Sequence, residues 1–338
     1  MRILDTVQVS PPASSFAHCL MNDTDRKPLS GLSLHLRSWA GVALPADELR
    51  ENMDFGERIN RILSISRIIL FCRRPHFTFD TGFFSVDGKH VSGKLLCRVD
   101  GETRTIPFSL EIPLGDDEKS FVPAANNHCE IHILDRQGKT VRILSAHSLS
   151  QHPEILKQDA WVNDLEVLYV GNVCKEGALS AFERVRSDKT LRELLLSMRK
   201  ALPDDDIIVY AFEYLPYDLI PLPGALMPQG SQTQNARFLS IKDHPLNEFQ
   251  KTCMEQAALI EYFRPAWNAF DKLISHPESQ RVFQRCEILD FSGVVIEIST
   301  VRSHFRLYSK AVLPMHHHMN ILDLSDPLKR ADFFAITL

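Results

Sequence analysis

Three glycine-containing turns divide residues 67–145 into short extended segments, and this pattern constrains the fold more than any other feature of the chain. Asp87-Gly88 and Asp100-Gly101 each separate segments rich in β-branched and aromatic residues. Such pairs fit two-residue hairpin turns because both central positions can take positive φ. Gln137-Gly138 separates two alternating apolar segments in the same way. With a helix expected before residue 67, residues 1–150 are predicted to form a mostly antiparallel β domain.

Residues 151–275 change to a mixture of strand and helix patterns. Residues 165–172 are a short apolar segment that ends near Gly171, and residues 179–202 carry apolar side chains at helical spacing. A second strand is predicted for IIVYAFEYL, and a helix for 246–264. Residues 216–243, rich in Pro, Gly, Ser and Gln, are too long for a plain connector and indicate a flap or a partner-specific insertion.

A third part, residues 276–338, returns to a β pattern and is expected to pack on one of the other two. The predicted fold class is therefore α+β: an N-terminal antiparallel β domain, a central unit with helices on a small sheet, and C-terminal strands.

Composition excludes several classes of protein. With 44% hydrophobic and 24% charged residues the chain has a globular balance, and no apolar run is long enough to span a membrane. The first residues lack the apolar stretch of a signal peptide, so a cytoplasmic location is expected. Seven scattered cysteines with no C-x-x-C pair argue against a disulfide framework and a thiolate zinc site, and indicate reduced, buried thiols.

Two motifs in the middle of the chain carry a resemblance. The first is LYVG, with Tyr169 and Gly171, followed by a helix pattern that contains Arg184. The second is ALIEYFRPAWN, which ends at Asn268. In order and spacing, residues 160–272 resemble the GIY-YIG nuclease superfamily, which includes the excision-repair endonuclease UvrC. ERVRSDKTL, VYAF and AALIEYFRPAWN further resemble a group of bacterial proteins to which no activity is assigned, and this likeness suggests a bacterial or mobile-element context.

The resemblance implies a small three-stranded antiparallel sheet with helices packed against it. In such a site the tyrosine helps to take a proton from the attacking water and the arginine neutralises the phosphate. A glutamate on the later helix holds one divalent metal ion, and the asparagine ties the following loop to the site. These roles fall on Tyr169, Arg184 and Asn268, with Gly171 beside the substrate.

Other positions depart from the family pattern. The metal-binding glutamate position falls on Gln256, whose neutral amide is a poor ligand for Mg²⁺ or Mn²⁺. Glu255 lies one residue earlier and therefore about 100° around the helix. The family's histidine position falls on Asp188, which would repel a phosphodiester, and no leading tyrosine is found in KQDAWVNDLEV.

The net charge of the chain and a few basic side chains indicate what kind of partner or ligand it could bind. The net charge is −5, and residues 151–275 hold 18 acidic and 13 basic side chains, whereas a DNA-cleaving domain is expected to be basic or at least neutral where it meets DNA. Arg73 and Arg74 are the best phosphate-binding candidates outside the motifs, with His276 a weaker third; both arginines are equally explained as edge-strand charges. His316 and His318 in MHHHM would share one face of a strand, as metal ligands or as surface residues.

These observations predict a GIY-YIG-like module with a decayed catalytic centre that recognises nucleic acid or a protein partner without a cofactor. One alternative is a divergent endonuclease that uses Mg²⁺ or Mn²⁺, with Glu255 or another carboxylate as the metal ligand. Another is a structural subunit of a larger complex. No membrane partner is expected.

Overall fold

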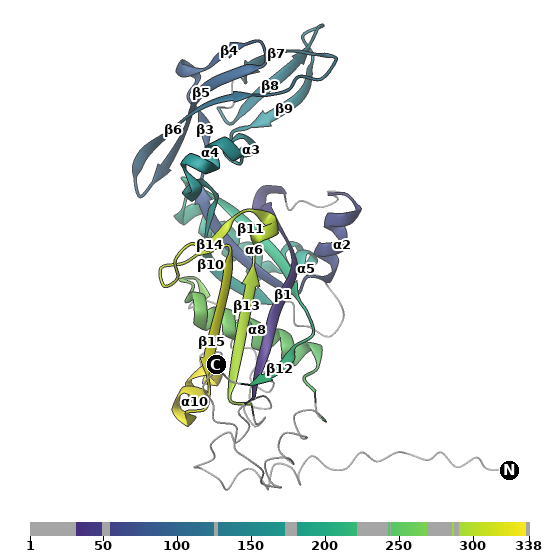
Figure 1. Ribbon diagram of the computed structural model, residues 1–338, viewed down its shortest axis with the longest axis vertical. Helices are drawn as coiled ribbons and strands as arrows, with labels where there is room; N and C mark the ends of the chain where they lie inside the picture. The colour runs from purple at the N-terminus through teal and green to yellow at the C-terminus, as the bar shows by residue number, and fades with distance from the viewer. Residues whose placement is uncertain are drawn as a thin grey trace, which may run out of the picture.

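The computed structural model describes residues 32–48, 55–124, 128–172, 181–221, 243, 245–268, 286 and 291–335. Both helices and strands are present, which confirms the α+β class. The molecule is elongated, with a lobe of short strands at one end and a larger body, built on one long sheet, at the other (Figure 1).

The body is organised around an eight-stranded sheet. Its order is β14 (Arg306–Tyr308), β10 (Asp164–Asn172), β2 (Ile68–Pro75), β11 (Asp205–Tyr214), β1 (Leu32–Pro45), β13 (Gly293–Ser299) and β15 (His317–Asp323), and β12 (Asp218–Pro221) also pairs with β1. Neighbours are antiparallel except β1 with β13 and β10 with β14. The expected strands 165–172 and IIVYAFEYL are thus confirmed as β10 and β11.

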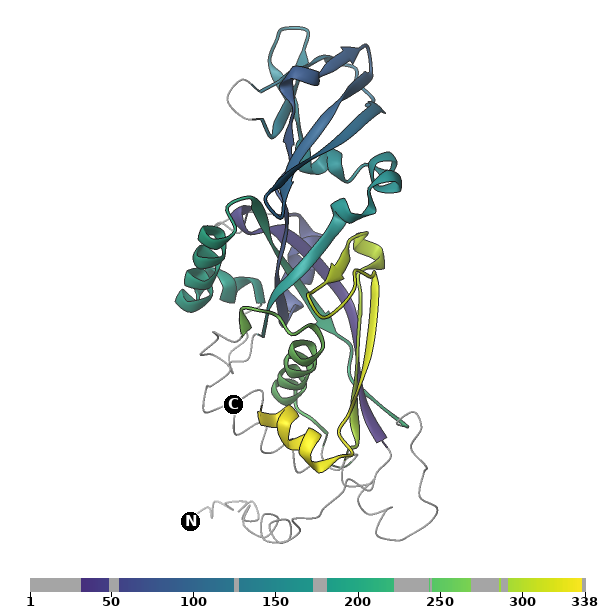
Figure 2. The ribbon, with the colours of Figure 1, turned by 90° about the vertical axis from the view of Figure 1, so that its left-hand side faces the viewer.

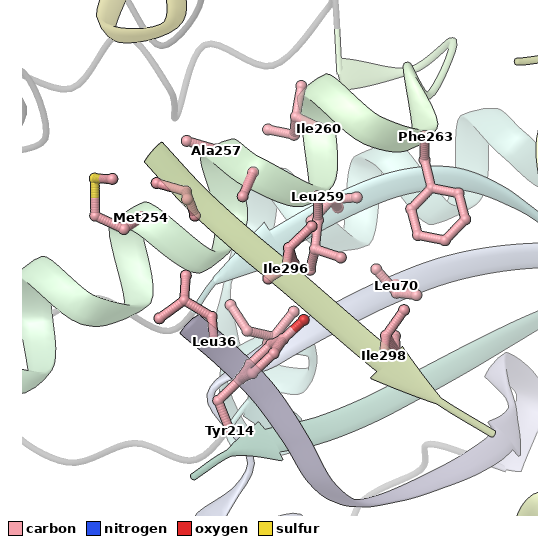
Figure 3. Close-up of a cluster of buried hydrophobic side chains, with 14 of the residues drawn as sticks. Leu36, Leu70, Tyr214, Met254, Ala257, Leu259, Ile260, Phe263, Ile296 and Ile298 are labelled. Atoms are coloured by element: carbon pink, nitrogen blue, oxygen red, sulfur yellow. The ribbon is translucent and has the colours of Figure 1, made fainter. Parts of the chain in front are cut away.

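Helices cover both faces of this sheet. α8 (Glu248–Phe263) packs its apolar side on one face, where Met254 and Ala257 meet Leu36 of β1 and Ile296 of β13 in one buried cluster (Figure 3). The other face is covered by α2 (Glu57–Ile65), α5 (Ala181–Ser187) and α6 (Lys189–Ala201). A strand covered on both faces is apolar along its whole length, and Ile68–Cys72 of β2 are all fully buried.

The helix predicted for 246–264 is confirmed as α8, and its ends follow from local chemistry. The Asn247 side chain accepts a hydrogen bond from the Gln250 N–H, and the Gln250 side chain accepts one from the Asn247 N–H, which forms a capping box. Arg264 ends the helix in the left-handed conformation just before Pro265.

The lobe contains two small sheets. One joins β3 (Thr78–Phe79), β4 (Ser85–Asp87), β5 (His90–Val99) and β6 (Glu102–Glu111), and the other joins β7 (Glu118–Pro123), β8 (Glu130–Asp135) and β9 (Thr140–Ser145). All three expected hairpins are present, and Gly88, Gly101 and Gly138 take positive φ in their turns. α3 (Ala146–Ser150) and α4 (Pro153–Gln158) close a separate core between the sheets.

The remaining helix and the short 3₁₀ turns are distributed over the lobe and the body. α10 (Pro327–Ala335) packs beside α8, and single 3₁₀ turns occur at Ala46–Glu48, Thr81–Phe83, Ala160–Asn163 and Val301–Ser303. Within the described residues, no helix has the length and apolar character needed to cross a membrane.

The division of the chain differs from the expected boundaries at 150 and 275. β1 and β2 lie in the range 1–150 but pair with β10 and β11, so the lobe is an excursion between β2 and β10 (Figure 2). The C-terminal strands β13, β14 and β15 join the same large sheet. The sheet that holds β10 therefore has eight strands, where the resemblance implied three.

Candidate functional site

Tyr169 and Gly171 lie on the same face of β10, turned toward the helices α5 and α6. The Tyr169 side chain is buried, and its ring centre lies 5.1 Å from that of Phe71 on the neighbouring strand β2. A Cβ atom at Gly171 would come within 2.7 Å of the Tyr169 ring, so only glycine lets the ring lie over this part of the strand. The tyrosine of the LYVG motif is thus part of a packed core.

Among the described strands, none pairs with one edge of β10 beyond Glu166, because β14 pairs only with Asp164–Glu166. We call the backbone groups of Leu168–Asn172 on this side the β10 edge. Unpaired backbone groups in a buried position are costly, and they need other partners. The segment that follows α8 and one side chain of α8 supply these partners.

Asn268 makes a double hydrogen bond to the β10 edge. Its Oδ1 accepts from the Val170 N–H at 2.8 Å, and its Nδ2 donates to the Val170 carbonyl oxygen, also at 2.8 Å. Just before it, the Trp267 N–H donates to the Leu168 carbonyl oxygen at 3.0 Å. The asparagine therefore ties the segment after α8 to the strand.

Gln256 contacts the β10 edge from α8. Its Nε2 donates to the Val170 carbonyl oxygen at 3.1 Å, and its Oε1 accepts from Asn172 Nδ2 at 2.5 Å. A carboxylate at this position could accept from Asn172 but could not donate to the carbonyl. The amide that departs from the family pattern therefore has a structural role of its own.

Asp188 begins α6 and separates it from α5, so the expected single helix 179–202 is two helices. The Asp188 side chain accepts hydrogen bonds from Thr190 N–H at 2.8 Å and from Leu191 N–H at 3.3 Å, which makes it the N-cap. Arg184 is part of α5, and its side chain lies outside the described part of the structure.

Glu255 is fully buried on α8, away from the β10 edge. Its Oε1 lies 4.0 Å from Lys251 Nζ, and the same ammonium lies 3.7 Å from Glu213 of β11. Burial, followed by the charge of Glu255, raises the pKa of Tyr214 well above its ordinary value. Glu255 and Gln256 thus contact different parts of the structure, as their angular separation on a helix predicts.

Arg73 and Arg74 are paired with carboxylates across the sheet. Arg73 Nε donates to Glu166 at 2.6 Å and Nη1 to Asp205 at 3.1 Å. Arg74 is buried, with Nε 3.5 Å from Asp206. The presence of a glutamate in the apolar strand LEVLYV is the sequence signal that could have located this network, because a buried carboxylate needs a cation.

Two cavities flank Arg74 where the lobe meets the body. One, of about 240 Å³, is lined among others by Arg73, Arg98, Leu202, Asp205 and Tyr308. The other, of about 290 Å³, is lined among others by Pro45, His147, Asn163 and Phe305. His147 Nε2 lies 2.7 Å from Arg74 Nη1, and burial and the arginine charge lower the pKa of His147 to about 3. Tyr169 and Gln256 line neither cavity.

The histidines of MHHHM are not grouped as metal ligands. His318 is buried, with Nδ1 3.0 Å from the Tyr262 hydroxyl and Nε2 3.0 Å from the Leu307 carbonyl oxygen. His316 Nδ1 lies 3.0 Å from the Phe305 carbonyl oxygen. Across the residues that the structure describes, no three His, Cys, Asp or Glu side chains form a group that could hold a metal ion.

Two further expectations concern residues that the structure does not describe. His276 and most of the segment 216–243 lie outside the described residues. Comparisons of the chain with protein-family models, with curated proteins and with solved structures gave no match.

Proposed function

We propose that this chain is a GIY-YIG-like module that recognises a protein partner and does not cut nucleic acid. The observation that carries the proposal is the use of Gln256. The position to which the resemblance assigns a metal-binding carboxylate bears an amide. One end of that amide donates to the Val170 carbonyl oxygen and the other accepts from the Asn172 side chain.

The centre of the large sheet supports the family part of the proposal. β10, β2 and β11 are three adjacent antiparallel strands, with α6 on one face and α8 on the other. In this proposal β2 takes the place of the leading strand, and the lobe is inserted between it and β10. Phe71 then stands beside Tyr169 where the first family tyrosine has no counterpart.

Charge favours a protein over a nucleic acid as the partner. Nucleic-acid binding depends on free cationic side chains that can neutralise phosphates. Arg73 and Arg74 instead face Glu166, Asp205 and Asp206, and the whole chain has a net charge of −5.

The lobe offers an apolar surface suited to a protein. Val122 of β7 and Ile143 of β9 are both cross-strand neighbours of His132 on β8. Residues so related share one face of a sheet. Their exposed fractions are 43% and 54%, and exposed apolar side chains grouped on one face are typical of interaction surfaces.

The first test is cleavage. Purified protein is incubated with plasmid and with single-stranded DNA in the presence of Mg²⁺ or Mn²⁺, and no cleavage is expected. Cleavage that disappears in both Tyr169→Phe and Arg184→Ala would overturn the proposal in favour of a divergent endonuclease.

The second test is binding. In the proposal, labelled DNA shows no retention at low salt, and a protein recovered from native extract is lost with Ile143→Glu but kept with the matched control Lys139→Glu, which changes an exposed polar position. The recovered protein is then purified and its affinity measured directly against both variants. Salt-sensitive retention of DNA, unaffected by Ile143→Glu, would contradict a protein partner.

A further inference from the structure

A thiol, an imidazole and a carboxylate lie in series where the lobe meets the large sheet. His76 Nε2 lies 3.2 Å from Cys129 Sγ, and His76 Nδ1 lies 2.6 Å from Asp206 Oδ1. His76 directly follows β2, Asp206 belongs to β11, and Cys129 stands immediately before β8 of the lobe. The resemblance assigns no role to any of the three residues.

Backbone hydrogen bonds fix the elements that carry these side chains. The His76 N–H donates to the Asp204 carbonyl oxygen at 3.1 Å, which joins the end of β2 to the start of β11. The Ala146 N–H donates to the Cys129 carbonyl oxygen at 2.7 Å, and the Phe79 N–H donates to the His128 carbonyl oxygen at 2.6 Å. The thiol is thus held against the imidazole by the pairing of the lobe itself.

The group is open to solvent on the imidazole side. The His76 side chain is 45% exposed, and Cys129 is half-buried. By contrast Cys72, Cys97, Cys253 and Cys286 are buried, as the sequence predicted for the thiols in general. A small reagent can therefore approach the pair formed by Cys129 and His76 in the folded protein.

The hydrogen bond with Asp206 determines which ring nitrogen of the neutral His76 carries the proton. Asp206 accepts from Nδ1–H, so the neutral ring keeps its lone pair on Nε2, directed at the thiol. The hydrogen bond with Asp206 raises the pKa of His76, although burial and the charge of Arg74 oppose it and Asp47 adds to it. Burial, Asp206 and Glu130 raise the pKa of Cys129.

A metal ion does not explain the group. The thiol and the carboxylate contact opposite nitrogens of one imidazole ring, so a single ion cannot bind all three ligands. A nucleophile next to a base that is itself oriented by a third group is the arrangement that activates thiols and hydroxyls for acyl transfer.

We propose that Cys129 is a nucleophilic thiol that accepts an acyl group from an activated ester or thioester, with His76 as general base and Asp206 as the residue that orients it. In the step, the S–H proton moves to His76 Nε2 and the sulfur attacks the acyl carbon. The bond from that carbon to the leaving oxygen or sulfur breaks, and the leaving group takes the proton from Nε2. The products are a thioester on Cys129 and a free alcohol or thiol.

The experiment uses the full chain with Cys19→Ser and Cys174→Ser, because these two cysteines lie outside the described residues. The probe is p-nitrophenyl acetate, followed by nitrophenolate release and by peptide mass spectrometry. We expect about one equivalent of rapid release and an acetyl group on Cys129, with loss of both in Cys129→Ala. The rate should rise with pH through the ionisation of His76 as the imidazole loses its proton.

Two variants test the roles of the neighbours. His76→Gln should slow acetylation of Cys129 by about 100-fold, the lower end of general-base effects. Asp206→Asn should slow it less and should move the pH profile toward lower pH, since the carboxylate no longer raises the pKa of His76. Buried Cys97 serves as the folding control, because it should react only in urea. Acetylation of Cys129 at an unchanged rate in His76→Gln, with Cys97 still protected, would overturn the proposal.

Discussion

Asn268 is the residue whose removal should reveal most directly how α8 is held to the sheet. In Asn268→Ala the Val170 N–H loses its side-chain partner, and Val170 is fully buried. An unsatisfied buried donor costs about 1–3 kcal/mol. The Val170 carbonyl oxygen keeps Gln256 Nε2, so loss of its second hydrogen bond should cost only about 1 kcal/mol. The free energy of unfolding should therefore fall by about 2–4 kcal/mol.

Urea unfolding followed by circular dichroism measures this difference. Asn320→Ala on β15, where the side chain is half-exposed, is the matched control and should change the free energy of unfolding by less than about 0.5 kcal/mol. Asn268→Asp keeps the acceptor for the Val170 N–H but turns a carboxylate oxygen toward the Val170 carbonyl. Its cost should be largest at neutral pH and should shrink in acid, because a protonated carboxyl can donate. An Asn268→Ala protein as stable as the control would refute this account of the β10 edge.

Three further substitutions test other parts of the structure. Asp188→Ala should cost about 1 kcal/mol in urea unfolding through loss of the N-cap, whereas Asp188→Asn should be nearly neutral because asparagine caps equally well. Gly171→Ala should destabilise by about 1–3 kcal/mol through the clash with Tyr169, and the cost should fall in a Tyr169→Leu background. The folded-state pKa of His147 is lowered to about 3, so the unfolded chain binds one more proton than the folded chain between about pH 6.5 and 3. As the pH falls through this range, the free energy of unfolding should therefore decrease by about 1.4 kcal/mol per pH unit. The decrease should be less steep in His147→Gln, whose amide can still accept from Arg74.

The hairpins and α8 could be predicted from the sequence, because the residues that determine them lie within or next to them. Each hairpin depends on a glycine that can take positive φ, and α8 depends on an N-cap and a proline next to its ends. The pairing of β2 with β10 could not be predicted in the same way. The two strands are separated by the whole lobe, and an apolar run such as Ile68–Cys72 reports burial on both faces but not the identity of its neighbours.

In the candidate site, too, the chemistry of a single side chain could be predicted from the sequence, but its contacts could not. The position of Gln256 was predicted to be unsuited to a metal ion, and that rests on the chemistry of one side chain. Its hydrogen bonds to Val170 and Asn172 depend on the packing of α8 beside the β10 edge, which no local pattern encodes. The series Cys129, His76 and Asp206 is likewise invisible in the sequence, because the nearest two of its members are 53 residues apart.

The lobe leaves the body at the end of β2 and returns at the start of β10, two strands that lie side by side in the sheet. Arg73 and Glu166, at these two ends, are opposite each other in the pairing. A short turn between these two positions could therefore join the strands and keep their pairing from Ile68 to Arg73 and from Glu166 to Asn172. Removal of the lobe would then offer a minimal version of this protein, and its replacement a way to graft new surfaces onto the same sheet.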